Sequence, residues 1–123
     1  MRKIFSYSLI VSTMLIMSGC GKEVTPPIYK WSEYSYTSVA YGMYGDREVI
    51  RQKHQDELSK IIEQSKSANK KVAPGIYAEY AQVLYESKNK LEAKKYFILE
   101  KETYPESTIF INRVLVKLYG DVK

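Results

Sequence analysis

The most reactive side chains in this sequence are a single cysteine, Cys20, and a single histidine, His54. Metal sites and nucleophilic active sites need several such groups together, so one thiol and one imidazole are a poor basis for either. No serine lies in a Gly-x-Ser-x-Gly turn, and no glycine-rich loop has phosphate-binding spacing. We therefore predict a protein that is not an enzyme, with no catalytic residues, metal ion, cofactor or small-molecule substrate.

Cys20 follows a segment with the order of an export signal. Arg2 and Lys3 come first, a mainly apolar stretch runs over 4–17, and small residues precede the cysteine. The apolar stretch is shorter than the run of about 20 residues that a membrane-spanning helix needs. Residues 1–19 are therefore predicted to be a cleaved signal peptide.

The end of this segment, Ile16-Met17-Ser18-Gly19-Cys20, resembles the lipobox of bacterial lipoproteins, with Met17 where leucine is usual. The resemblance implies that Cys20 carries diacylglycerol and palmitate-like acyl chains, which suffice for stable membrane anchoring. The alternative is a buried or free thiol, since a lone cysteine forms no disulfide within the chain. In the lipoprotein-sorting pattern of many Gram-negative bacteria, the absence of aspartate directly after the cysteine sends the protein to the outer membrane. Gly21 stands at that position, so the resemblance implies a protein on the outer membrane that faces the periplasm, if the host is Gram-negative.

The rest of the chain divides into a short tether and one small domain. Residues 20–30 are predicted to be a lipidated tether, in which Pro26 and Pro27 favour extended backbone. From Cys20 to Trp31 this tether reaches at most about 38 Å, which keeps the domain close to the membrane. Residues 31–123 are predicted to be a single helical domain.

Apolar residues recur at spacings of three and four along this domain, and no segment shows hairpin chemistry. We therefore predict an all-α fold of about four to five helices. The first helix is expected to begin near Glu33 with Ser32 as its cap, and the second to span 47–67 with Asp46 as its cap. The others are expected to start after Pro74-Gly75, to span 91–104 before Pro105, and to run from a cap at Ser107 or Thr108 to Gly120.

Residues 74–107 span 34 positions, the length of a tetratricopeptide repeat. Residues in register with that motif include an aromatic at Tyr77, a small residue at Ala81 and a closing proline at Pro105. Leu84, Lys88 and Glu100 depart from it, standing in place of a tyrosine, a glycine and an alanine. The resemblance implies tetratricopeptide-like antiparallel helical hairpins packed through Tyr77, Tyr80, Ala81, Leu84, Ala93, Phe97 and Pro105. The alternative is any helical hairpin with alternating large and small inner residues.

Three short runs, Pro74-Gly75-Ile76-Tyr77-Ala78-Glu79, Tyr104-Pro105-Glu106-Ser107-Thr108 and Trp31-x-x-Tyr34, resemble a family of small bacterial lipoproteins that carry a domain of unknown function. Members similar to this chain tend to be encoded beside a lipoprotein like the curli-secretion channel and a second small lipoprotein. The resemblance implies a shared envelope assembly, with a curli-secretion-channel-like lipoprotein as the expected partner.

The charged residues indicate solvation more than chemistry. The net charge of +5 is weak evidence for a polyanionic partner, and an exported protein is not expected to bind nucleic acid. His54 is expected to be a partly buried packing residue. Carboxylates interleaved with lysine are expected to form a solvated face: Glu57, Glu63, Glu79, Glu86, Glu92, Glu100 and Glu102. Basic residues are expected to converge on one edge: Lys66, Lys70, Lys71, Lys88, Lys90, Lys94 and Lys95.

The function predicted from these features is that of a protein-interaction adaptor or assembly factor, anchored to the outer membrane, in an envelope or secretion complex. Solvent-facing aromatic residues are expected to form the partner surface: Tyr36, Tyr44, Tyr85 and Phe110. The alternative is a structural envelope lipoprotein that binds anionic lipid or glycan through the basic edge.

Overall fold

The computed structural model describes residues 26–120, and this part of the chain folds into five α-helices, one 3₁₀ turn and no strands. The predicted all-α fold is therefore confirmed. The elements are α2 (Tyr34–Tyr44), α3 (Glu48–Ser67), α4 (Ile76–Glu86), α5 (Lys90–Thr103), η1 (Pro105–Ser107) and α6 (Thr108–Tyr119). In the described range, no helix is both long and apolar enough to span a bilayer.

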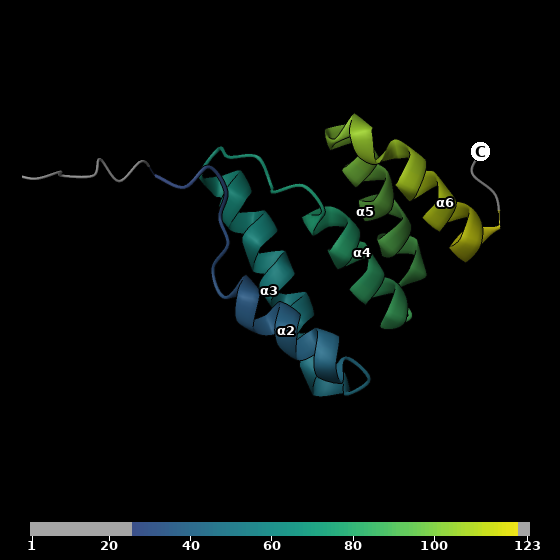
Figure 1. Ribbon diagram of the computed structural model, residues 1–123, viewed down its shortest axis with the longest axis horizontal. Coiled ribbons are helices and arrows are strands. Elements are labelled where there is room, and N and C mark those ends of the chain that lie inside the picture. The colour runs from purple at the N-terminus through teal and green to yellow at the C-terminus, as the bar shows by residue number, and fades with distance from the viewer. Residues whose placement is uncertain (1–25, 121–123) are drawn as a thin grey trace, which may run out of the picture.

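The helices lie side by side in chain order, with α2 and α3 at one end of the molecule and α6 at the other (Figure 1). Each helix packs mainly on the next one, and the most extensive contact is between α4 and α5. Short connections make consecutive helices antiparallel. The molecule is therefore a row of helices in which α2 and α6 each keep one side without a helical neighbour.

Two apolar clusters form the core. The first joins α3 to α4 through residues such as Leu58, Ile61 and Ile76, and the second joins α4, α5 and α6 through Phe97, Ile111 and Leu115. Ala81 and Ala93 are fully buried where α4 and α5 meet, because small side chains let two helices approach closely. Tyr80 and Tyr96 contact both clusters, with ring centroids 4.7 Å apart in an edge-to-face arrangement.

The first helix of each hairpin begins with a carboxylate supplied by the second. Glu57 of α3 accepts a hydrogen bond from the backbone N–H of Glu33 at 2.9 Å, just before α2. Glu100 of α5 accepts one from the N–H of Gly75 at 2.8 Å, just before α4. A carboxylate at a helix N-terminus satisfies an unpaired donor and complements the helix dipole. The two hairpins therefore share one capping device.

The starts of the helices differ from the predicted caps. Ser32 does not cap α2: it adopts a left-handed φ of 45°, and Glu33, the residue before α2, makes no side-chain cap either. Asp46 does not cap α3, which begins after Arg47, again without a side-chain cap. Ser107 precedes α6 as predicted, but its hydroxyl donates to the Tyr104 carbonyl instead of capping α6. For α2 a carboxylate from another helix, and for α6 the preceding 3₁₀ turn, satisfies backbone N–H groups in place of the predicted caps.

Candidate functional site

A chain of buried and partly buried polar groups joins α2, α3 and α4. His54 is fully buried, with Nδ1 3.0 Å from Thr37 Oγ1 and Nε2 2.8 Å from Glu79 Oε1. The other carboxylate oxygen of Glu79 accepts a hydrogen bond from the Tyr34 hydroxyl at 2.7 Å. The ring of Tyr41 stacks on the imidazole, with centroids 4.9 Å apart. We call these five residues the polar cluster.

Helical spacing places the members of the polar cluster. Tyr34, Thr37 and Tyr41 follow one another at three and four positions, so they lie on the side of α2 that faces α3 and α4. His54 is one turn from Leu58 on the inner side of α3. The prediction of a partly buried packing histidine is corrected, since burial removes water from both ring nitrogens and each has a protein partner instead.

The electrostatics of the polar cluster favour an ionised Glu79. Burial alone would raise the pKa of its carboxyl, but hydrogen bonds from His54 and Tyr34 hold the pKa below its ordinary value. For Tyr34, burial and the hydrogen bond to Glu79 both raise the pKa of the phenol. Glu79 is therefore a carboxylate and Tyr34 a neutral donor across the physiological pH range.

The polar cluster places the Thr37 hydroxyl, the His54 imidazole and the Glu79 carboxylate in the order found in a nucleophilic triad. A nucleophile must meet its substrate, however, and Thr37 is only 2% exposed while His54 is 0% exposed. Tyr41 covers the ring from one side. The arrangement therefore fixes α2 against α3 and α4, and its chemistry is that of a buried hydrogen-bond network.

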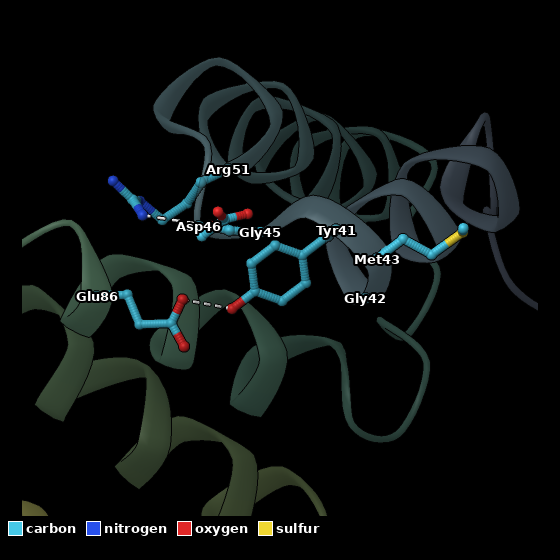
Figure 2. A pocket seen from close by; sticks show the side chains of 7 residues that line it. All are labelled: Tyr41, Gly42, Met43, Gly45, Asp46, Arg51 and Glu86. Carbon is cyan, nitrogen blue, oxygen red and sulfur yellow. Dashed lines mark hydrogen bonds between the residues drawn. The ribbon is translucent and has the colours of Figure 1, made fainter.

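A shallow hollow of about 670 Å³ lies at the turn between α2 and α3. Figure 2 shows two hydrogen bonds among its lining residues: the Tyr41 hydroxyl donates to Glu86 at 2.6 Å, and Arg51 donates to the Gly45 carbonyl at 3.3 Å. A Cβ on Gly45 would lie 2.6 Å from the Tyr41 carbonyl oxygen, so glycine is needed for this tight turn. The hollow therefore follows from the shape of the turn between α2 and α3.

A second and more apolar cleft, of about 550 Å³, lies between α4 and α6. Phe97 of α5 lies beneath it, and Phe110, which is 62% exposed, stands on its α6 side. Glu79 and Glu86 line the α4 side and Lys117 the α6 side. We call this the α4–α6 cleft; its other lining residues are Gly75, Ala78, Gln82, Tyr85, Val114 and Leu118.

The residues predicted to pack the repeat lie mostly at the contact between α4 and α5. Five of them are buried: Tyr77, Ala81, Leu84, Ala93 and Phe97. Tyr80 is partly buried and contacts both core clusters. Pro105 is exposed and begins η1, directly after α5.

The four residues predicted as a partner surface lie in two separate places. Tyr36 and Tyr44 are exposed on α2, whereas Tyr85 and Phe110 line the α4–α6 cleft. Tyr85 is not fully solvent-facing as predicted: its ring packs edge-to-face with Tyr119, at a centroid distance of 5.7 Å, and its hydroxyl is 3.4 Å from the Leu118 carbonyl. The four therefore do not form a single surface.

The predicted basic edge does not form. Lys66, Lys70 and Lys71 lie before α4 begins, while Lys88 and Lys90 lie after α4 ends. These groups are thus separated by the length of an 11-residue helix, roughly 16 Å. The last two, Lys94 and Lys95, lie along α5, over the ring of Tyr119 and beside Glu92.

Three of the carboxylates expected on a solvated face are instead bonded inside the fold. Glu57 and Glu100 are buried at helix N-termini, and Glu79 is partly buried in the polar cluster. The other four, Glu63, Glu86, Glu92 and Glu102, are exposed or partly exposed. Spacing along one helix gave no signal for the three, because each partner comes from a different helix. Only Glu100 could have been singled out from the sequence, because it stands where the repeat motif has alanine.

Two predictions from the sequence concern the lipid anchor and metal binding. Cys20 and the predicted signal peptide, residues 1–19, lie outside the described residues, as does the first half of the predicted tether. Across residues 26–120, His, Asp and Glu side chains nowhere gather in a group of three that could hold a metal ion.

The model of a family described as a domain of unknown function (DUF4810) matches residues 28–114, which is more than half of the chain and reaches from before α2 into α6. No curated protein and no solved structure matches the chain significantly.

Proposed function

This chain belongs to the DUF4810 family, a domain of unknown function, and we propose that it is a lipid-anchored adaptor of the bacterial envelope. In this proposal Cys20 carries the lipid that holds the protein on the outer membrane, on its periplasmic side. The helical domain then binds a protein partner in the α4–α6 cleft.

The observation that carries the proposal is the exposed ring of Phe110 beside an apolar cleft. Phe110 is 62% exposed, and Val114 and Leu118 continue its side of the cleft over the next two turns of α6. A phenylalanine in water gives up a large part of its burial free energy, on the order of 1.5–3 kcal/mol. Aromatic residues beside apolar clefts are typical of the centre of protein interfaces.

The charges around the α4–α6 cleft support one kind of partner segment. The exposed carboxylate of Glu86 lines the α4 side, next to Glu79, whose oxygens are already bonded within the polar cluster. Lys117 lines the opposite side. The segment that fits carries apolar side chains for the floor and a basic residue toward α4. A curli-secretion-channel-like lipoprotein is the partner that we propose.

A tetratricopeptide-like architecture belongs to the same proposal. Its supports are the two buried alanines, Ala81 and Ala93, where α4 meets α5, and the carboxylate cap that both hairpins share. In arrays of this kind, stacked hairpins present a groove to a partner.

The test joins lipid labelling with capture of the partner. Labelled palmitate is expected to enter the wild-type protein and not the Cys20→Ser variant. After gentle crosslinking in the native host, the wild type is expected to retain one envelope lipoprotein, and Phe110→Glu to lose it. Ile109→Glu is the matched control, since Ile109 is 71% exposed next to Phe110 but lies outside the cleft. Equal capture by both variants would contradict a role for the cleft, and an unlabelled wild type would contradict the anchor.

A further inference from the structure

The outer side of α2 is apolar and exposed. Tyr36, Val39 and Met43 follow one another at three and four positions, and each is 63–66% exposed. They border a shallow groove of about 690 Å³ that also contacts Tyr44 and Ile50. We call Tyr36, Val39, Met43, Tyr44 and Ile50 the α2 face.

The α2 face is the second apolar side of the same helix. Tyr34, Thr37 and Tyr41 already hold the inner side of α2 on α3 and α4. A helix that is apolar on two sides is ordinarily covered on both. No helix of the described chain covers the outer side, because α2 lies at the end of the row (Figure 1).

The cations at the border of the α2 face lie over its aromatic rings. The guanidinium of Arg47 is 5.0 Å from the centroid of Tyr44, and the ammonium of Lys53 is 4.7 Å from that of Tyr36. Of the nearby acidic residues, Glu48 is paired with Arg51 at 2.9 Å. Tyrosines bordered by cations, around an apolar centre, are typical of surfaces that sit at the level of lipid headgroups.

An anchor at Cys20 would place the α2 face near a bilayer. The described chain begins at Pro26, six positions after Cys20, so a lipid on that cysteine lies within about 22 Å of Pro26. Two more apolar side chains, Ile28 at 77% and Trp31 at 44% exposure, lie on the segment that leads into α2. An anchor at Cys20 would therefore hold this end of the molecule, rather than α6, near the membrane.

We propose that the α2 face lies on the membrane surface, with Tyr36, Val39 and Met43 at the headgroup boundary and Arg47 and Lys53 toward anionic phosphates. The inference rests on the anchoring at Cys20 in the proposed function. Because α6 lies at the other end of the row, this orientation presents the α4–α6 cleft away from the bilayer.

The test places a tryptophan in the α2 face of the full lipidated protein. The chain has a single tryptophan, so Trp31→Phe removes the native signal. Val39→Trp then reports on the α2 face and Val116→Trp on α6, where the native valine is also exposed, at 51%. The proteins are reconstituted into vesicles of phosphatidylethanolamine and phosphatidylglycerol that contain lipids with brominated acyl chains. We expect several-fold stronger quenching at position 39 than at 116, and weaker quenching at 39 after Arg47→Glu with Lys53→Glu.

Each other outcome overturns the inference. Equal quenching at the two positions, in protein that carries lipid by mass spectrometry, rejects the membrane contact and leaves the anchor intact. Crosslinking of position 39 to a second copy or to another protein, without quenching, assigns the face to that partner instead. A protein without lipid that does not float with the vesicles rejects the anchor and the membrane contact together. Met43→Trp, at a position 64% exposed, replaces Val39→Trp if that variant does not fold.

Discussion

The imidazole of His54 lies 2.8 Å from the carboxylate of Glu79, across 25 positions of sequence and with α3 on one side and α4 on the other. The second nitrogen of the same ring contacts Thr37 of α2. One fully buried side chain thus joins three helices. The polar cluster is thus a second link between the N-terminal hairpin and the rest of the row, beside the apolar cluster that joins α3 to α4.

Replacing His54 tests this link. His54→Ala leaves Thr37 and Glu79 without their partner and opens a cavity under Tyr41, so we expect a loss of about 2–4 kcal/mol in the free energy of unfolding. Glu63→Ala, at an exposed position on the same helix, should change it by less than about 0.5 kcal/mol. Urea denaturation of both variants measures the difference, and equal stabilities would contradict the link.

Acid should weaken the fold through Glu79. Its folded pKa is below the ordinary value of 4.5, so its contribution to stability is complete above that pH and is lost as the pH falls through the folded pKa. Glu57, whose pKa is also lowered, adds a contribution of the same sign. Melting temperatures measured from pH 7 to pH 3 should fall most steeply below pH 4.5. The Glu79→Gln variant should fall less steeply, and an unchanged slope would refute the assignment to Glu79.

Sequence periodicity predicted the helices well, because each helix buries one side at a regular spacing. The inner positions Leu58, Ala81 and Phe97 are visible from that spacing alone. The polar cluster was not visible, since Thr37, His54 and Glu79 come from three helices and meet only after packing. The spacing of His54 from Leu58 indicated that this histidine lies on the inner side of its helix. The sequence of that helix did not identify Thr37 and Glu79 as its partners.

Lys88 adopts a left-handed backbone after α4, with φ 67°, where the repeat motif has glycine. The N–H of Asn89 bonds to the Leu84 carbonyl at 2.9 Å, which closes the helix in the usual left-handed C-cap. Because a side chain is strained at this φ, we expect Lys88→Gly to stabilise the fold by about 0.5–1 kcal/mol. Lys95→Gly, inside α5, should instead destabilise it by about 1 kcal/mol. Calorimetry on the two variants measures both changes in stability. If Lys88→Gly destabilised the fold as Lys95→Gly does, backbone strain at Lys88 would be excluded.

Glu100 stands where the repeat motif has alanine, and its contact with the Gly75 N–H explains why. Glu100→Ala removes a buried acceptor from the start of α4, so we expect a loss of about 1–3 kcal/mol. Glu100→Gln keeps an oxygen in place and should lose less. Should the alanine variant prove as stable as the wild type in chemical denaturation, the capping role of this carboxylate would be rejected.

The surfaces were harder to predict than the core, for a geometric reason. The lysines near 70 and near 90 are close in the sequence, yet the intervening helix separates them, because they lie at opposite ends of α4. Phe110 and Tyr85 are far apart in the sequence, yet both line the α4–α6 cleft. Surface neighbours depend on how helices pair, and a single sequence shows this only where a repeat motif fixes the pairing.

The claim that the α4–α6 cleft holds an envelope partner is tested most directly by crosslinking from within it. A photoreactive benzoylphenylalanine is placed at position 110 in one strain and at position 109 in another, and cells of the native host are irradiated. We predict one discrete crosslinked product from position 110, containing another envelope lipoprotein by mass spectrometry, and none from position 109. No product from either position, or the same products from both, would contradict the assignment of the cleft as the partner site.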